Sequence, residues 1–439
     1  MYFVGANYWQ APYISINDTY ANLTTAIRNL TNHGIQSIRI MVSSQEPYYC
    51  YSVTPGMETD GNLSCISYRK IDFILNATRE YNNKTNKLKV VMVLSNFWSW
   101  TGGLARYVNN TYDEITKIPC IRVNGSEAEF IEYTTNFYDN REAQDMLKRL
   151  FYNIANHVNE YSNVAYKNDD AIMSWEIVNE AIPGEDLTVF RSWVSDIVSY
   201  IKSIDTNHLV TIGSIGTRYD EEFMLTHEIS GIDYITFSLH PSEWDWIKSS
   251  EGRTPLQNAK LNTSAYMKEI VEIARIIRKP LILNVFDYPR DKNSYSPSSK
   301  VEDRDDYFKH VLSEVTKYAE DRLMVGAYFW GWSDSFKCTE TPKGTILPPP
   351  TCGQKWLFEH LIIGDRTDHP QGAFSVYESD TSTMKVIKKA SDTLRQFPLQ
   401  DPIPDYLWVL CAAIIGGFLL FLGILLDDMC RHLYDNGYK

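Results

Sequence analysis

Two segments of the chain place acidic side chains where a short apolar run ends. The segment AIMSWEIVNEA (171–181) ends with Asn179 and Glu180 before its last alanine, and the segment KPLILNVFDYPR (279–290) contains Asp287. Two carboxylates about 5–9.5 Å apart can hydrolyse a glycosidic bond, one acting as an acid and the other as a nucleophile or base. These residue types therefore indicate glycoside chemistry, provided that the fold brings the two segments together.

The elements that must position these side chains follow from the hydrophobic pattern. Short, nearly continuous apolar runs predict strands that are buried on both faces. These runs lie at residues 2–7, 35–42, 88–94, 171–178, 208–213, 233–238, 280–286 and 324–330. Amphipathic stretches between them predict helices. The stretches lie at residues 19–32, 68–82, 141–161, 186–203, 262–277 and 303–319.

This alternation predicts an α/β fold, a (β/α)8 TIM barrel over residues 1–397. A doubly wound sheet is the alternative, but it usually has a Gly-rich phosphate turn after its first strand, and GANYWQAP (5–12) is not one. A barrel builds its active site at the C-terminal ends of its strands. The residues expected there are Arg39, Asn96, Trp98, Trp175, Asn179, Glu180, His240, Trp244, Asn284, Val285, Asp287, Trp330 and Trp332. They show no metal-ligand spacing, so we expect neither a metal nor another cofactor.

Several of these residues lie in segments that resemble a known enzyme family. SWEIVNE (174–180) resembles the acid/base motif of glycoside hydrolase family 5, and the likeness is greatest to its endo-β-1,4-mannanase branch. Further segments resemble that branch in the same order: SNFWSWTGGLARYV (95–108), 137–181, 200–216 and 231–244. The resemblance covers most of residues 2–335. It implies retaining hydrolysis of a β-mannan by two carboxylates about 5–5.5 Å apart.

The resemblance also implies roles for individual residues. Glu180 matches the acid/base, and Asn179 matches the residue that holds the 2-hydroxyl of the sugar. The expected substrate-binding residues are Arg39, Asn96, Trp98, His240, Trp244 and Trp330. Of these, Arg39 is expected to brace the region of the nucleophile. Sugar stacking and core packing remain alternative roles for Trp100, Trp246 and Trp332.

The nucleophile of the family is missing. The Lys-Pro and Pro-Arg pairs that flank it align without a gap at the two ends of KPLILNVFDYPR, and its own position is Val285. An isopropyl group cannot attack carbon, so the ordinary double displacement is predicted to be lost. Asp287 lies about 6.6 Å further along the strand and is a candidate substitute, as the general base of an inverting mechanism. The alternative is that Asp287 is a loop residue paired with Arg290 or Lys292.

Positions near the missing nucleophile also depart from the family pattern. Ser238 and His240 replace a cleft histidine and the tyrosine that contacts the nucleophile, and Ala181 replaces a proline. These changes indicate relaxed or redirected constraint around the second carboxylate.

A long apolar run follows the predicted barrel. Residues 406–426, YLWVLCAAIIGGFLLFLGILL, carry no charge and are long enough to cross a bilayer, which takes about 20 helical residues. They predict one transmembrane helix after a Pro-rich spacer (398–405) and before a short cytoplasmic tail (427–439). No glycosylation sequon follows this run. The sequons that precede it start at Asn17, Asn22, Asn29, Asn62, Asn76, Asn83, Asn109, Asn124 and Asn262. They predict a cell-surface protein with the N-terminal domain outside.

A location outside the cell requires an export signal and allows disulfides to form. The start MYFVGANYWQ is not an export signal, so we expect that signal to lie outside this chain; a tail-anchored cytosolic protein is the alternative. Cysteines bracket two short loops and predict the disulfides Cys50–Cys65 and Cys338–Cys352, leaving Cys120 unassigned. The net charge of −13 disfavours nucleic acid and anionic membrane surfaces as partners.

Three functions remain open on the sequence. The chain is a glycan-binding protein that keeps the mannanase cleft without hydrolysis, a working glycosidase that uses Asp287, or a structural protein with the barrel as scaffold. Glu180, Asn179 and the cleft tryptophans argue against the scaffold, and Val285 favours binding without hydrolysis. The expected partner is a β-mannan-like polysaccharide or oligosaccharide, and nothing in the sequence indicates a protein partner.

Overall fold

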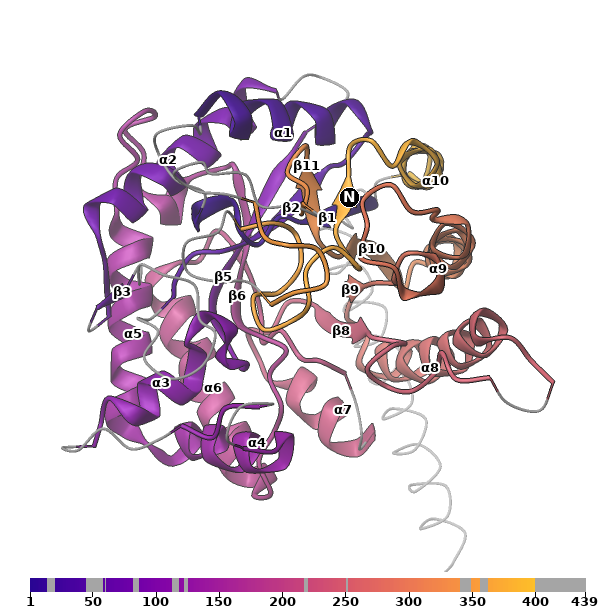
Figure 1. Ribbon diagram of the computed structural model, residues 1–439. Coiled ribbons are helices and arrows are strands. Elements are labelled where there is room, and N and C mark those ends of the chain that lie inside the picture. Colours follow the sequence, from indigo (N-terminus) through magenta and orange to yellow (C-terminus); the bar gives the residue numbers. More distant parts are fainter. Residues whose placement is uncertain are drawn as a thin grey trace, which may run out of the picture. The chain divides into compact units, whose positions relative to one another are not determined.

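Eight parallel strands form the centre of the protein, and helices surround them (Figure 1). The computed structural model describes residues 1–13, 20–44, 58–59, 61–81, 87–112, 118–121, 125–216, 220–249, 252–339, 349–355 and 362–398. Residues Met1–Phe397 form one compact unit.

The strands follow the order β7-β6-β5-β2-β1-β10-β9-β8. Their bounds are β1 Phe3–Asn7, β2 Ser37–Met41, β5 Lys89–Asn96, β6 Ile172–Asn179, β7 Leu209–Thr211, β8 Ile235–Leu239, β9 Leu281–Phe286 and β10 Met324–Phe329. The first and last strands of this order, β7 and β8, also meet, because Asp233 N, just before β8, donates to Val210 O of β7 at 2.8 Å. The sheet therefore closes into a (β/α)8 barrel. The predicted fold class and all eight predicted strands are confirmed.

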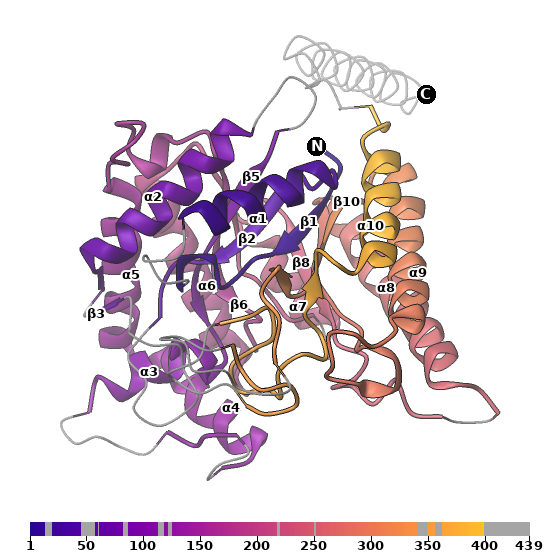
Figure 2. The same cartoon turned by 45° about the horizontal axis from the view of Figure 1, so that its top comes forward.

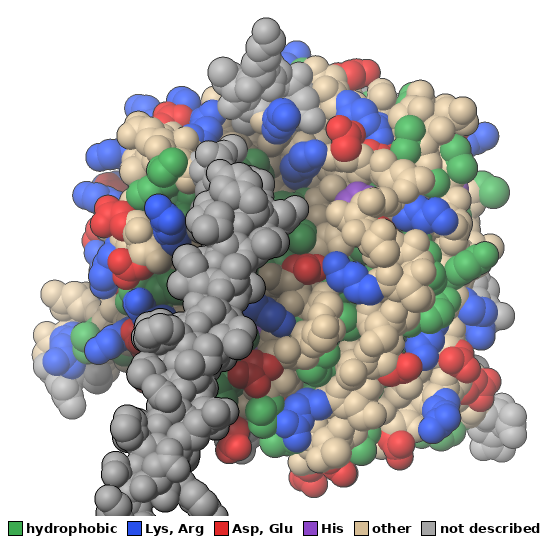
Figure 3. All heavy atoms as spheres, turned by 180° about the vertical axis from the view of Figure 1, so that it is seen from behind, with side chains coloured by type: hydrophobic (Ala, Val, Ile, Leu, Met, Phe, Trp, Pro, Cys, Tyr) green, Lys and Arg blue, Asp and Glu red, His purple; other side chains and the backbone are tan. Residues whose placement is uncertain are grey.

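Helices cover the outside of the barrel, and α8, α9 and α10 stand side by side along one flank (Figure 2). The bounds are α1 Tyr20–Asn32, α2 Cys65–Glu80, α3 Gly103–Asn109, α4 Glu127–Thr135, α5 Arg141–Asn156, α6 Leu187–Ile204, α7 Asp220–Glu228, α8 Pro255–Ile277, α9 Glu302–Glu320 and α10 Thr381–Leu394. All six predicted helices form, as α1, α2, α5, α6, α8 and α9. Acidic and basic side chains are interspersed on the face shown in Figure 3, as on a solvated surface.

Helix α5 ends earlier than predicted. Its apolar stripe is buried as expected and comprises Met146, Leu147, Leu150, Phe151 and Ile154. The predicted end at residue 161 is wrong, because His157 has extended backbone and its ring contacts the buried Asp72 at 3.1 Å. Val158, which was expected on the stripe, is 49% exposed.

Alternate residues on each strand pack on opposite sides of the barrel wall. On β5, Val91 and Val93 belong to an interior cluster made almost entirely of strand and loop residues. Their neighbours Val90, Met92 and Leu94 belong to the cluster that packs beneath the helices. Each fully buried side chain of this size contributes about 1.5–3 kcal/mol to folding. The barrel is thus a filled core that holds the loops at its C-terminal end in place.

Short strands and one disulfide organise the loops. Strands β3 (Glu58–Thr59) and β4 (Asn62–Leu63) pair with each other, and β11 (Trp332–Asp334) pairs with β12 (Val376–Tyr377). Cys338 and Cys352 are joined, as predicted. The predicted Cys50–Cys65 disulfide is wrong, because Cys65 begins α2 with an exposed, free thiol. Cys120 is disulfide-bonded instead, to a partner outside the described residues.

The predicted membrane segment, residues 406–426, lies outside the described residues, as do the sequons at Asn17, Asn83 and Asn124. Within the part of the chain that the structure describes, no helix is long and apolar enough to span a membrane. Among the remaining sequons, Asn22 and Asn62 are exposed, whereas Asn29, Asn76 and Asn262 are half-buried. The prediction for Asn109 is wrong, because its side chain is buried at the end of α3 and leaves no room for a glycan.

The end of β7 requires a glycine. Gly213 has a φ of +83°, and a Cβ there would lie 1.9 Å from Val178 O and 2.6 Å from a carboxylate oxygen of Glu176. Gly252 has a similar φ of +78° but no atom within 4 Å of its Cβ position, which makes it a matched control.

We expect Gly252→Ala to lower the free energy of unfolding by about 1–2 kcal/mol, the cost of a left-handed backbone at a residue with a Cβ. Gly213→Ala should lower it by about 1–3 kcal/mol more, because it also overpacks the barrel wall. Urea unfolding of both variants measures the difference. Equal losses would show that the close approach at Gly213 is unimportant.

Candidate active site

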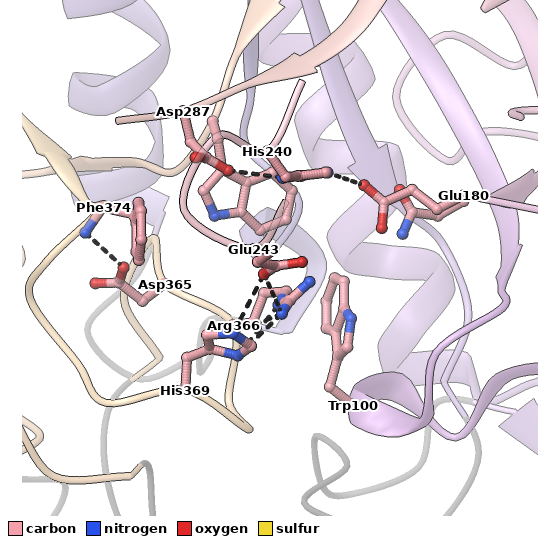
Figure 4. A pocket seen from close by; sticks show the side chains of 11 residues that line it. Trp100, Glu180, His240, Glu243, Asp287, Asp365, Arg366, His369 and Phe374 are labelled. Atoms are coloured by element: carbon pink, nitrogen blue, oxygen red, sulfur yellow. Dashed lines mark hydrogen bonds and ion pairs between the residues drawn. The ribbon is translucent and has the colours of Figure 1, made fainter. Parts of the chain in front are cut away.

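One pocket lies at the C-terminal end of the barrel (Figure 4). It is lined by Trp100, Asn179, Glu180, His240, Glu243, Asp287, Trp330, Asp365, Arg366, His369 and Phe374. The structure therefore brings Glu180 and Asp287 together with His240 and Trp330, as the sequence predicted. Eight other residues predicted for this end of the barrel are not part of the pocket wall: Arg39, Asn96, Trp98, Trp175, Trp244, Asn284, Val285 and Trp332.

Glu180 lies at the turn that follows β6. Its φ is 57°, a left-handed conformation that a glutamate rarely adopts and that clusters at functional sites. Its Oε1 lies 2.6 Å from Nε2 of His240, and its Oε2 accepts a hydrogen bond from the Trp98 indole at 2.7 Å. The residue is only 5% exposed. Both carboxylate oxygens of Glu180 are thus held in fixed directions.

A buried network beneath the pocket fixes Asn179. Arg39 pairs with Glu176 on β6 and donates to Oδ1 of Asn179 at 2.8 Å. Nδ2 of Asn179 donates to Oδ1 of Asn96 at 2.9 Å, and Arg39 also donates to Oδ1 of Asn7 at 2.9 Å. These five side chains are at most 1% exposed. Arg39 and Asn96 therefore brace the pocket from below and do not line it.

Val285 points into the barrel interior. The register of β9 shifts between Leu283 and Val285 against β8, and a bulge of this kind re-aims a side chain. Ile282 and Val285 consequently both join the interior cluster. Val285 is fully buried, and its neighbour across the strand pair is Ser238. The position that the sequence resemblance assigns to the nucleophile thus presents an apolar side chain to the barrel interior.

His240 lies between the two acidic residues of the pocket. Its Nε2 faces Glu180, and its Nδ1 lies 2.8 Å from Oδ2 of Asp287 (Figure 4). A neutral imidazole has one N–H and can donate to only one of the two carboxylates, whereas an imidazolium donates to both. The geometry therefore favours the charged form of His240.

The pKa values of the three groups agree with this arrangement. Burial disfavours the imidazolium, but Glu180 and Asp287 outweigh it and raise the pKa of His240 well above its usual range. Burial raises the pKa of Glu180, but the charge and hydrogen bond of His240 outweigh it, so that this pKa is lowered. Burial raises the pKa of Asp287, and His240 offsets only part of that effect. Near neutral pH, Glu180 is consequently a carboxylate.

The three contacting residues Glu180, His240 and Asp287 are called the His240 triad below. Their arrangement bears on both the retaining and the inverting mechanism of glycoside cleavage. A general acid must carry a proton near the working pH, and the lowered pKa of Glu180 opposes that role. An inverting pair needs a water between its carboxylates, and here the ring of His240 occupies the space between Glu180 and Asp287. The alternative in which Asp287 is paired with Arg290 or Lys292 is wrong, because Asp287 contacts His240 and Arg290 is bonded to Asp380 at 2.7 Å.

Tryptophans form one wall of the site. The rings of Trp9 and Trp330 are parallel, with centroids 6.4 Å apart, and Trp100 packs edge-on against both. Trp100 and Trp330 line the pocket, so Trp100 belongs to the site and not only to the core. Trp244 packs edge-on against His240, at 5.7 Å between ring centroids, and is not part of the pocket wall. Trp98 contributes a hydrogen bond to Glu180.

A charged cluster at the rim was not predicted. Arg366 donates to Glu243 at 2.7 Å, and Nε2 of His369 lies 3.3 Å from Glu243. Asp368 lies 2.9 Å from His369. Burial raises the pKa of the Asp368 carboxyl, but His369 helps to lower that pKa to about 2. The only sequence signal was the charged run DRTDH (365–369), which has no periodicity. Among the described residues, no group of His, Cys, Asp and Glu side chains is arranged to hold a metal ion.

The fold and the site can now be compared with known proteins. The family model described as "GH family 5 beta-mannosidase-like" matches residues 1–398. The chain belongs to glycoside hydrolase family 5. It is 23% identical to mannan endo-1,4-β-mannosidase 7 of Arabidopsis thaliana over 74% of this chain and 72% of that protein. It is 24% identical to putative mannan endo-1,4-β-mannosidase 4 of the same plant over 82% and 87%.

Solved structures show the same similarity. The family 5 mannosidase of Rhizomucor miehei superposes with a TM-score of 0.78 at 26% identity, over 90% of this chain and 93% of that one. A variant of that mannosidase has been solved in complex with mannosyl-fructose. The endo-β-1,4-mannanase of Thermotoga petrophila shares the fold, with a TM-score of 0.63 at 19% identity over 91% and 78%.

The His240 triad predicts a pH-dependent contribution to stability. The pKa of His240 is raised in the folded state, so its contribution is complete below its unfolded pKa and is lost as the pH rises through the folded value. We expect His240→Gln to lower the free energy of unfolding by about 3–5 kcal/mol at pH 6, as when a buried ion pair is broken.

This loss should shrink as the pH rises towards and past the raised pKa of His240. Denaturant unfolding of both proteins between pH 6 and 10 measures it. His310→Gln is the control, because burial lowers the pKa of that half-buried histidine. A loss that stays constant over this pH range would contradict a charged His240.

Proposed function

We propose that this family 5 protein binds β-linked mannosides in the pocket beside Glu180 without hydrolysing them by the retaining route. The relatives named as mannan endo-1,4-β-mannosidases and the mannosyl-fructose complex of the Rhizomucor miehei mannosidase support the choice of sugar. The tryptophan wall of Trp100 and Trp330 supports a carbohydrate ligand, since flat aromatic faces suit the apolar faces of sugar rings.

The observation that carries the proposal is that the second carboxylate of a retaining pair is missing. At the position that the resemblance assigns to the nucleophile, Val285 is fully buried and apolar. The remaining acid of the pocket, Asp287, faces His240 and reaches Glu180 only through that ring. Retaining cleavage needs a carboxylate that attacks the anomeric carbon directly. The pocket thus keeps groups that hold a sugar and lacks the group that forms the glycosyl-enzyme.

The working glycosidase that uses Asp287 is the second candidate. Its supporting observation is that Asp287 lines the pocket with a raised pKa, as a general base often has. The position of His240 weighs against it, because the ring stands where the attacking water would have to lie. A pure scaffold would not require the left-handed Glu180 or the buried Arg39 network.

The proposed function can be tested with β-1,4-manno-oligosaccharides. We expect the full chain to bind them without hydrolysis and Glu180→Gln to leave hydrolysis at background. Val285→Glu together with His240→Tyr should raise hydrolysis at least tenfold above background, because it restores the nucleophile and frees Glu180 from the imidazolium.

Val285→Glu alone should gain less, because His240 would still hold Glu180 as a carboxylate. Calorimetry and product chromatography measure binding and cleavage. Hydrolysis by the unaltered chain that Glu180→Gln abolishes would contradict the proposal.

We also propose that residues 406–426 anchor the protein in a membrane with the barrel outside. The uncharged run and the sequons before it support this topology. The full chain should remain with membranes after an alkaline wash, whereas a chain ending at Phe397 should be soluble. Glycosidase treatment should reduce the mass of both. Recovery of the full chain in the soluble fraction would contradict the anchor.

A further inference from the structure

The chain leaves the barrel at the end opposite the pocket. The last turn of α10 lies at the N-terminal ends of the strands, because Ser391 Oγ donates to the carbonyl of Gly34, just before β2, at 2.5 Å. Tyr2, just before β1, packs against Phe397 with the ring centroids 5.4 Å apart. Figure 2 shows the end marked N and the last turn of α10 at one end of the barrel, and the orange loops that contribute to the pocket at the other.

Only a short spacer separates this point from the proposed membrane segment. Nine Cα–Cα steps connect Phe397 to Tyr406, so these two residues are at most about 30–32 Å apart. The 14 residues of α10 alone span about 21 Å of the distance back to the pocket end. An orientation with the pocket end against a bilayer would therefore use most of the reach of the spacer, whereas the opposite orientation needs very little of it.

The N-terminal end of the barrel, called the basal face below, carries exposed apolar and basic side chains. The apolar ones are 43–65% exposed and comprise Val158, Tyr161, Leu209 and Ile276. The basic ones are Lys87, Arg278 and Arg322. All of them lie at or beside the connections that lead from a helix into the following strand, which in a barrel are at its N-terminal end.

This combination of side chains suits the headgroup region of a bilayer. Single exposed apolar side chains are common on protein surfaces. Those of the basal face, however, share the end of the barrel from which the chain leaves. Tyrosine is enriched at membrane–water interfaces, and Lys and Arg place their apolar stems along apolar surface while their charged ends stay in water.

The charges indicate which kind of lipid surface fits. The basal face is seen in Figure 3, the view from behind the barrel of Figure 1, and acidic and basic side chains are interspersed on it. The chain as a whole has a net charge of −13, so an anionic surface would repel it. A surface of zwitterionic phospholipid carries both signs of charge and avoids this repulsion.

We propose that the basal face rests on the surface of a zwitterionic phospholipid bilayer and that the pocket opens away from it. The short spacer keeps this face at the bilayer, and its exposed apolar side chains enter the headgroup region. The pocket then takes glycans from the surroundings of the membrane and does not reach glycolipid headgroups of the same bilayer. This inference rests on the proposed membrane anchor and specifies which end of the barrel faces the lipid.

Two serines on either side of β8 provide matched positions for a probe. Ser230 precedes the strand at the basal face, Ser249 follows it at the pocket end, and both are exposed. Ser230→Cys and Ser249→Cys would each be made in the full chain with Cys65→Ser, Cys411→Ser and Cys430→Ser. Each variant would be labelled with a thiol-reactive fluorophore and placed in phosphatidylcholine nanodiscs. Phosphatidylcholine with a nitroxide on its headgroup then quenches those labels that lie at the bilayer surface.

We expect the nitroxide lipid to quench the label at position 230 by at least half and the label at position 249 by less than a tenth. Equal quenching at the two positions, stronger quenching at position 249, or no quenching at either position of nanodisc-bound protein would overturn the inference. Failure of the full chain to enter nanodiscs would overturn the proposed anchor itself.

Two exposed apolar residues of α8 test the contact of the basal face with lipid. Ile276 is 65% exposed in the last turn of α8, and Leu261 is 52% exposed in its first half. Ile276→Asp should lower the quenching at position 230 by at least a third, because a carboxylate is costly to remove from water. Leu261→Asp should leave that quenching unchanged. Equal effects of the two substitutions would overturn the contact of the basal face.

Discussion

Two carboxylates buried close together at the end of a barrel repel each other, and a cation between them favours the ionised form of both. In this protein that cation is His240, which reaches Glu180 with one ring nitrogen and Asp287 with the other. The charge of the imidazolium lowers the pKa of Glu180 against the effect of burial. The same ring separates the two acids, so the arrangement that stabilises the site also opposes its use in hydrolysis.

The two halves of the site differ in what they keep of the family 5 pattern. The half built on β6 retains Asn179 and Glu180, braced by Arg39 and Glu176. In the half built on β9, the apolar side chain of Val285 stands at the position that the sequence resemblance assigns to the nucleophile. Binding of a sugar depends on the shape of the pocket and on its polar groups, whereas retaining cleavage depends on that single carboxylate. If the second half no longer supports cleavage, as we propose, binding of a sugar can therefore remain intact.

Local patterns in the sequence predicted most of the fold and part of the site. Apolar runs located all eight strands, since parallel strands are buried on both faces, and the Asn-Glu pair located Glu180. The sequence predicted that Glu180, His240 and Asp287 lie at the same end of the barrel. It could not predict that the ring of His240 lies between the two carboxylates, because that depends on side-chain directions in the folded protein. The rim loop with Arg366 has no periodicity, and tertiary hydrogen bonds alone define its path.

We propose that no carboxylate of this pocket attacks a sugar. Mass spectrometry of the full chain after incubation with 2-deoxy-2-fluoro-β-mannosyl fluoride tests it directly, because a retaining nucleophile would be trapped as a stable glycosyl ester. The mass of the unaltered chain should not change, whereas Val285→Glu with His240→Tyr should gain one fluoromannosyl group. An adduct on Asp287, or on any other carboxylate of the unaltered chain, would contradict it.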